Sequence, residues 1–137
     1  MAEADPAPLP LEQRRPLSPH LLIYKLSPTM VVSGGHRVSG LFLYIGTLLL
    51  AWYLLSAAGD AHSFQTASAF FGSIFGQLVL FGYTFTLMLH AVGGVRHAIW
   101  DAGKGFDTEE RTALAWGSLI TAGALTILIW VAHFILR

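Results

Sequence analysis

Three long apolar stretches constrain this chain more than any other feature. They lie near 38–58, 71–99 and 114–136, and each is long enough to cross a bilayer core, which takes roughly 20 predominantly apolar residues. Only 12% of the 137 residues are charged, against about 25% in soluble domains. No stretch shows the period-2 alternation of a barrel strand, and backbone groups in lipid must be hydrogen-bonded internally. We therefore predict an all-α membrane protein, a bundle of three transmembrane helices.

Basic residues are spread unevenly around these spans. All but one of the eight lysines and arginines lie before the first span or around the second connection: Arg14, Arg15, Lys25, Arg37, Arg96, Lys104 and Arg111. By the positive-inside rule, the N-terminus and the second connection face the cytoplasm or its mitochondrial equivalent, the matrix. The first residues resemble neither a signal peptide nor an organelle transit peptide. We therefore expect a multi-pass protein of the bacterial inner membrane.

The chain divides into three parts. Residues 1–14 are rich in proline and acids, which predicts a disordered tail. In residues 15–32 prolines alternate with a short apolar group, so we predict an extended segment on the inner membrane surface, with a simple tether as the alternative. Residues 33–137 form the transmembrane domain. We expect residues 59–70 to be a short outer loop, and Thr108 to begin a helix after a short inner loop.

Cysteine is absent from the chain. Iron–sulphur ligation, disulfides and covalent attachment of a c-type haem are therefore excluded. The chain also has no glycine-rich loop placed between a strand and a helix, as nucleotide binding would require. Any redox chemistry must use a cofactor held by other side chains.

The second span carries ionisable residues, which mark a functional site by default inside a membrane. A face of small or polar residues recurs at steps of three and four: Gly82, Thr86, His90, Gly93, His97 and Asp101. His90 lies about 10 Å deeper along the helix than His97. A neutral imidazole among glycines is suited to ligating haem iron. A histidine that hydrogen-bonds across helices explains the pattern equally well.

A low-spin haem on His90 would need a second axial ligand at the same depth. We place His36 at the inner surface, His133 near the outer surface and His62 in a loop. None of them matches His90 in depth. The second ligand is therefore predicted to come from a second membrane subunit.

The first span begins with the sequence SGGHRVSG, residues 33–40. Ser33, His36, Arg37 and Gly40 share one helical face. A serine hydroxyl and an arginine at the inner surface can hydrogen-bond a quinone carbonyl or a haem propionate. The alternative is that His36 and Arg37 only anchor the helix at the lipid headgroups. The grouping of four such residues favours a site.

Together these motifs resemble those of the cytochrome b556 subunit family of succinate dehydrogenase (succinate:quinone oxidoreductase, respiratory complex II). The matching segments are Arg15-Pro16, Ser33 to Ser39, His90 to His97 and Trp100 to Gly103. The resemblance covers nearly the whole chain beyond the tail. It implies a membrane anchor that takes part in electron transport and has no succinate-oxidising activity by itself.

The resemblance also implies roles for individual residues. His90 would be an axial ligand of haem b, with the second ligand from a companion small anchor subunit. Ser33 and Arg37 would line the ubiquinone pocket, which the companion anchor and the iron–sulphur subunit complete. His36 and Arg37 would lie near the haem propionates, and His97 and Asp101 would contact a propionate and end the helix.

The partners implied are the second small anchor subunit, the iron–sulphur subunit, the flavoprotein subunit and membrane lipid, with no nucleic acid. Three alternatives stay open. A quinol:fumarate reductase anchor would use the same geometry in the opposite direction. A small transporter or channel subunit would line a polar path with the face from His90 to Asp101. A structural anchor would hold no haem.

Overall fold

The computed structural model describes Pro10 and residues 25–136. Four helices make up nearly all of this part: α2 (Pro28–Ala58), α3 (Ala61–Gly72), α4 (Ile74–Asp101) and α5 (Thr108–Leu136). The predicted tail and most of the predicted interfacial segment, up to residue 24, lie outside the described residues. No strand occurs among the described residues, and α2, α4 and α5 are long and apolar enough to cross a membrane. The prediction of an all-α membrane fold with three spans is confirmed.

Helix α2 begins well before the predicted span. Ser27 caps it by accepting a hydrogen bond from the backbone N–H of Met30 at 3.3 Å, and Pro28 occupies its first turn. Proline suits this position because its missing N–H is one that the first turn leaves unpaired anyway. Residues 28–32, predicted to be part of an extended segment, therefore form the start of α2. The SGGHRVSG motif lies inside a helix instead of at its beginning.

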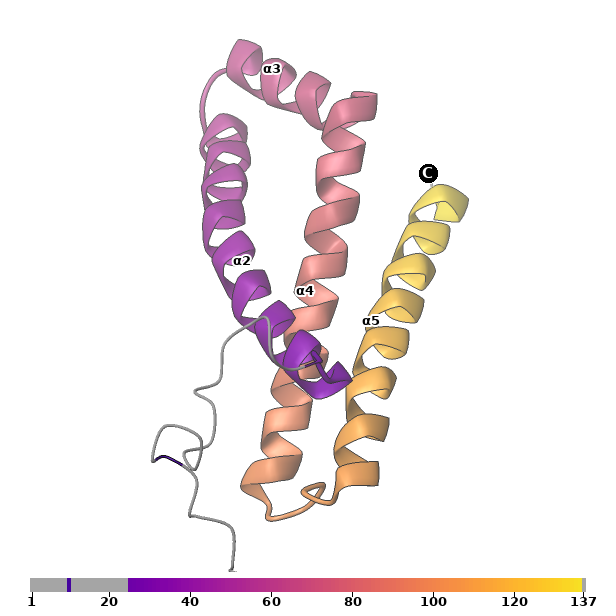
Figure 1. The fold of residues 1–137 in the computed structure, drawn as a ribbon. Coiled ribbons are helices and arrows are strands. Elements are labelled where there is room, and N and C mark those ends of the chain that lie inside the picture. Colours follow the sequence, from indigo (N-terminus) through magenta and orange to yellow (C-terminus); the bar gives the residue numbers. More distant parts are fainter. Residues whose placement is uncertain (1–9, 11–24, 137) are drawn as a thin grey trace, which may run out of the picture.

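Helix α3 replaces the predicted outer loop. The carboxylate of Asp60 accepts hydrogen bonds from the backbone N–H of Ser63 at 2.8 Å and from its hydroxyl at 3.1 Å, which caps the helix. The pKa of Asp60 is lowered by these bonds, with the backbone N–H of Ser63 the largest cause. At the other end Ser73 is extended and caps α4 through the backbone N–H of Gly76. Helix α3 thus runs across one end of the molecule from α2 to α4 (Figure 1).

The connection between α4 and α5 is short and lies at the opposite end from α3 (Figure 1). Gly103 and Gly105 adopt φ values of 75° and 78°, a region that favours glycine. The indole N–H of Trp100 donates to the carbonyl of Gly105 at 3.0 Å and fastens the turn. Helix α5 begins at Thr108, as predicted, with Glu109 and Glu110 in its first turn, where acids complement the helix dipole.

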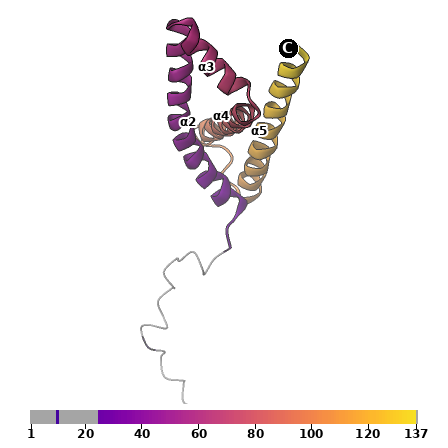
Figure 2. The same ribbon diagram turned by 90° about the horizontal axis from the view of Figure 1, so that it is seen from above.

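Helix α4 is the centre of the bundle and packs against each of the other three helices. Its contact with α5 uses small side chains, because α5 buries Ala115, Ser118, Ala122 and Thr126. Small residues let membrane helices approach closely. The N-terminal part of α2 also reaches α5, whereas the opposite ends of α2 and α5 diverge (Figures 1 and 2).

Candidate functional site

The candidate site lies where α2 crosses α4, and two glycines allow the helices to approach. A Cβ atom on Gly40 of α2 would lie 3.2 Å from Cε1 of His90. A Cβ atom on Gly93 of α4 would overlap the imidazole of His36. Each glycine therefore makes room for a histidine from the facing helix. The glycines in the two motifs therefore do more than separate polar residues, because the imidazoles of His90 and His36 occupy the space beside them.

Three histidines meet at this crossing. The rings of His36 and His90 stack with centroids 4.2 Å apart and planes 9° from parallel. His97 meets His36 edge-on at 5.0 Å. Two of the residues predicted on the face of α4, together with Gly93, therefore pack around His36. The stack leaves His90 half-buried, while His97 is exposed.

One nitrogen of His90 is tied to the backbone of α2. Its Nδ1 lies 3.0 Å from the hydroxyl of Ser39 and 3.2 Å from the carbonyl oxygen of His36. The Ser39 hydroxyl donates to the same carbonyl at 2.6 Å. The other ring nitrogen, Nε2, makes no hydrogen bond to a described residue and is not among the buried atoms that lack a partner. It is the nitrogen of His90 that can take a ligand.

The remaining predicted residues do not all join this cluster. Arg37 is exposed and Ser33 is half-buried, and neither side chain forms a hydrogen bond within the described part of the chain. The predicted face of α2 therefore splits, with His36 and Gly40 directed at α4 and Arg37 directed outward. Asp101 is exposed at the end of α4, and an added Cβ atom at Gly82 would meet nothing within 4 Å.

The expected depth of His36 is wrong. His36 lies eight residues after Pro28, where α2 begins, so it is about two turns inside the helix and level with His90. It still cannot be the second axial ligand of a haem on His90. The two rings stack in contact with each other at 4.2 Å, so a flat group bound by His90 would find no space between them. His62 and His133 lie in α3 and in the last turn of α5.

Arg96, which the sequence placed among the basic residues around the second connection, is a further candidate for the site. It is only 2% exposed, and Nε, Nη1 and Nη2 all lack a hydrogen-bond partner among the described residues. Its guanidinium lies 5.1 Å from the centre of the Trp100 ring, where a cation is attracted to the ring face. A buried cation without acceptors is costly, which makes it a functional candidate. In the sequence, its position next to His97 was the available indication that Arg96 belongs to the site.

No group of three or more metal-ligating side chains occurs in residues 25–136. An isolated ion therefore finds no protein cage there. A metal that brings its own equatorial ligands needs only axial groups from protein. His90, with one ring nitrogen fixed and the other unbonded, meets that lesser requirement.

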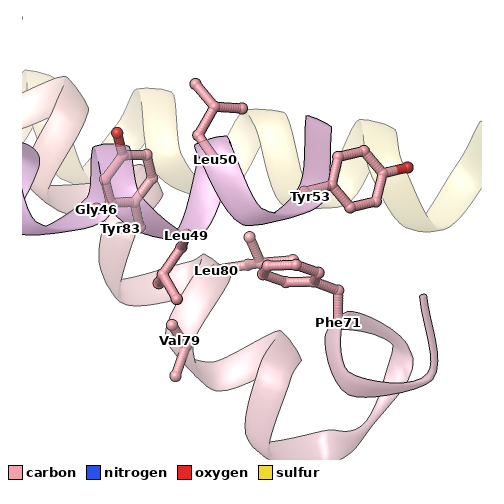
Figure 3. A pocket seen from close by; sticks show the side chains of 8 residues that line it. All are labelled: Gly46, Leu49, Leu50, Tyr53, Phe71, Val79, Leu80 and Tyr83. Carbon is pink, nitrogen blue, oxygen red and sulfur yellow. The ribbon is translucent and has the colours of Figure 1, made fainter. Parts of the chain in front are cut away.

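An apolar cavity of about 340 Å³ lies between α2, α4 and the end of α3 (Figure 3). Its lining is Gly46, Leu49, Leu50, Tyr53, Phe71, Val79, Leu80 and Tyr83. In Figure 3 the hydroxyls of Tyr53 and Tyr83 point away from the other side chains. Gly46 is about 15 Å along α2 from His36. This cavity is distinct from the histidine cluster and suits hydrocarbon.

The fold and the site define a three-span helical membrane protein with a histidine cluster inside the bundle. Residues 12–132 match the family of succinate dehydrogenase/fumarate reductase transmembrane subunits. The chain belongs to this family. Its members are subunits of an enzyme complex and are not catalytic alone, as predicted. The match gives no support to a transporter or channel subunit.

Individual relatives agree with this assignment. The chain is 33% identical over 118 residues to the succinate dehydrogenase cytochrome b556 subunit of Rickettsia felis, covering 86% of this chain and 92% of the relative. It is 34% identical over 120 residues to the subunit of the same name from Paracoccus denitrificans, covering 85% and 92%. It is 38% identical over 104 residues to the mitochondrial cytochrome b560 subunit of Sus scrofa, covering 74% and 62%. The resemblance seen in the motifs is confirmed.

Proposed function

We propose that this chain is the membrane-anchor cytochrome b subunit of a succinate dehydrogenase, that it holds haem b through His90, and that Ser33 and Arg37 form part of its ubiquinone-reduction site. The main support for the proposal is the hydrogen bonding of the two ring nitrogens of His90. Its Nδ1 is fixed by two oxygen atoms of α2, and its Nε2 has no hydrogen bond to a described residue. A metal-ligating histidine commonly has its second nitrogen bonded in this way.

The surroundings of His90 fit a haem. His36 stacks on its ring, and Gly40 and Gly93 keep the space between the helices open for the two imidazoles. Nε2 of His36 is buried and has no hydrogen-bond partner in the described part of the chain. Arg37, which follows His36, and His97, whose ring lies 5.0 Å from that of His36, are exposed. These three residues are the candidates for holding the propionates. When bound, the haem supplies a one-electron carrier beside the quinone site.

The quinone site is proposed at the start of α2. Ser33 and Arg37 are four residues apart and therefore neighbours on the helix surface. Each side chain can donate to a quinone carbonyl, because neither is engaged with a described residue. The fixed charge of Arg37 would stabilise negative charge that develops on the carbonyl oxygen during reduction. An exposed arginine does not enclose a quinone alone, so other subunits must complete the pocket.

The proposed partners are a second small anchor subunit, an iron–sulphur subunit and a flavoprotein subunit, in a bilayer. Stacking removes His36 as a second axial ligand, which supports a companion subunit that supplies one. The chain has no cysteine, so the iron–sulphur clusters that would deliver the electrons must be held by another subunit. Electrons from succinate would thus reach the quinone through the soluble subunits.

We propose a bacterial inner membrane location with the N-terminus in the cytoplasm. Lys25 precedes α2 and Lys104 lies between α4 and α5. The connection from α2 to α4, which includes α3, has no lysine or arginine. The positive-inside rule then sets the orientation.

The first experiment is a reduced-minus-oxidised visible spectrum of the complex purified through a tag on this chain. A low-spin b-type signal that succinate also produces is expected. His90→Ala should abolish that signal, whereas His62→Ala on exposed α3 should leave it unchanged. Full haem content in the His90→Ala complex would refute the ligand assignment. A complex that reduces quinone without haem would leave only the structural anchor.

The quinone assignment has its own test. Ser33→Ala and Arg37→Ala should depress succinate:quinone activity and spare electron transfer from succinate to a soluble dye. Arg111→Gln, an exposed arginine in the first turn of α5, is the matched control and should change neither. Normal quinone reduction in both variants would place the pocket elsewhere.

The direction of the reaction is a further part of the proposal. The family description includes fumarate reductases, which would oxidise a quinol instead. Assays with ubiquinone and with menaquinol separate the two directions. Succinate-dependent ubiquinone reduction as the faster activity is the expected result, and faster menaquinol-dependent fumarate reduction would favour the alternative.

A further inference from the structure

The hydrogen bonds around His90 determine which of its nitrogens carries the hydrogen. The Ser39 hydroxyl donates to the carbonyl of His36 at 2.6 Å. Nδ1 of His90 lies 3.0 Å from that hydroxyl oxygen and 3.2 Å from that carbonyl oxygen. A carbonyl only accepts, and the single hydroxyl hydrogen is already directed at it. Both oxygens therefore offer lone pairs to Nδ1, which must be the donor.

We infer that Ser39 is a positioning residue which, together with the backbone carbonyl of His36, holds His90 in the Nδ1–H tautomer and so turns the lone pair of Nε2 toward the ligand. This inference rests on the proposed function, in which that ligand is haem iron. It assigns a role to a side chain that touches neither haem nor quinone in the proposal. Ser39 acts only through His90.

The local packing makes this hydrogen-bond arrangement effective. Ser39 is 3% exposed, so water does not compete for Nδ1, and hydrogen bonds are stronger in such a low-dielectric setting. The His36 ring lies flat on His90 with planes 9° apart. An added Cβ atom at Gly40 would lie 3.2 Å from Cε1 on the edge of the same ring. Rotation of the imidazole is therefore opposed by stacking as well as by hydrogen bonds.

The same residues explain why α2 can supply both oxygens. A serine in a helix commonly bonds back to a carbonyl in the preceding turn, and Ser39 reaches the carbonyl of His36 three residues earlier. This brings the hydroxyl oxygen and the carbonyl oxygen to one point on the helix surface. Opposite that point, α4 places His90. One turn of α2 thus forms an acceptor pair for a single N–H group.

The chemical consequence concerns the strength of the ligand. An imidazole whose second N–H donates to an acceptor is more basic at its metal-binding nitrogen, and loss of such a partner typically costs about 10- to 100-fold in metal affinity. A stronger donor favours ferric over ferrous iron. Removing the Ser39 hydroxyl should therefore raise the midpoint potential of the haem and weaken its retention. Because the carbonyl of His36 remains at 3.2 Å, the loss should lie near the lower end of that range.

The test compares two substitutions of nearly equal shape in the whole complex. Ser39→Val removes the hydroxyl, and Ser39→Thr keeps it. Redox titration of the visible spectrum should give a higher midpoint potential and about 10-fold weaker haem retention for Ser39→Val, and values restored toward the wild type for Ser39→Thr. If Ser39→Val does not assemble, Ser39→Ala removes the same hydroxyl without added volume and should give the same shift.

The matched control is Thr47→Val on the same helix. Thr47 is exposed and bonds back to the carbonyl of Tyr44 at 2.6 Å, as Ser39 does to His36, but its hydroxyl forms no hydrogen bond to a histidine among the described residues. Its loss should leave the potential unchanged. A general effect of removing a helix hydroxyl would shift both variants equally and would overturn the inference.

The possible results distinguish failure of the Ser39 role from failure of His90 as the haem ligand. If His90→Ala loses the haem while Ser39→Val and Ser39→Thr share the wild-type potential and haem retention, Ser39 has no positioning role and the ligand assignment stands. If His90→Ala keeps the haem, or the wild-type complex contains none, the ligand assignment fails and takes the inference with it. A shift in Ser39→Val that Ser39→Thr reverses supports both.

Discussion

Two adjacent glycines on α4 offer a sharp test of the helix crossing. A Cβ atom on Gly93 would overlap the ring of His36 and lie 2.9 Å from its Nε2, whereas a Cβ atom on Gly94 would meet nothing within 4 Å. The His36 ring is rigid and stacked on His90, so a small adjustment at the end of a flexible side chain cannot relieve the overlap. Gly93→Ala must displace the whole ring or separate the helices.

The magnitude follows from comparing the two substitutions. Each replaces a helical glycine by alanine and gains about 0.8–1 kcal/mol of helix propensity, so this gain cancels in the difference. What remains is the cost of overpacking, typically about 1–3 kcal/mol. Gly93→Ala is therefore expected to be about 1–3 kcal/mol less stable than Gly94→Ala.

Thermal unfolding of the detergent-solubilised complex, with both variants at the same concentration, provides the assay. The midpoint for Gly93→Ala should lie roughly 3 °C or more below that for Gly94→Ala. The visible spectrum should change only in the Gly93→Ala complex, because His36 packs on His90. Equal midpoints and equal spectra would refute the contact between Gly93 and His36.

Three further predictions concern the ends of the helices. The lowered pKa of Asp60 means that its capping of α3 is fully present above the ordinary pKa of the carboxyl and is lost as pH falls through the lowered pKa of the folded state. Amide exchange at Ser63 should therefore quicken relative to a mid-helix amide over that acid range. A pH-independent ratio of the two exchange rates would contradict this prediction. Trp100→Phe keeps an aromatic ring, although a smaller one, and removes the donor to Gly105. Loss of the hydrogen bond should cost about 1 kcal/mol, seen as faster amide exchange in residues 102–107. Gly103→Ala places a side chain at φ 75° with nothing within 4 Å, so only the backbone penalty of about 1–2 kcal/mol applies. The unfolding midpoint should fall, and an unchanged midpoint would argue against the left-handed turn.

The length of the apolar runs was enough to predict three spans, because membrane burial dominates the composition of α4 and α5. It failed at the start of α2, since Pro28 fits both an extended segment and the first turn of a helix. The Ser27 cap decides between them. The polar SGGHRVSG motif also lowered the apparent length of the span. A helix can continue through such residues when they face another helix instead of lipid.

Helix α3 was missed for a related reason. Residues 59–70 are too polar to cross a membrane, and we expected a loop wherever an apolar span stopped. Asp60 followed three residues later by Ser63 was the local signal for a helix start. The phenylalanines at the end of α3 add packing that spacing alone does not reveal, since Phe71 contacts Trp52 and Tyr53 of α2.

The sequence indicated which residues lie near one another on α4, but it did not indicate how they pack against α2. His90, Gly93 and His97 do gather on one side of α4, as their spacing indicates. Two features could not be read from one helix alone: the stack of His36 on His90 and the burial of Arg96. Both depend on where α2 begins and on where it crosses α4. The depth of His36 was misplaced because it was counted from a helix start that lies ten residues too late, at 38 instead of 28.

The true start of α2 also explains how one short motif can serve two sites. Successive helical residues lie about 100° apart, so adjacent residues such as His36 and Arg37 can point in different directions. In the fold, His36, Ser39 and Gly40 turn toward α4 and surround His90, while Arg37 turns outward. Under the proposed function, the inward set would hold the haem ligand His90 in place, and Arg37 would be available to the quinone or to another subunit. Substitutions in the inward set should therefore alter haem properties first, and substitution of Arg37 should alter quinone reduction first, although the residues are adjacent in sequence.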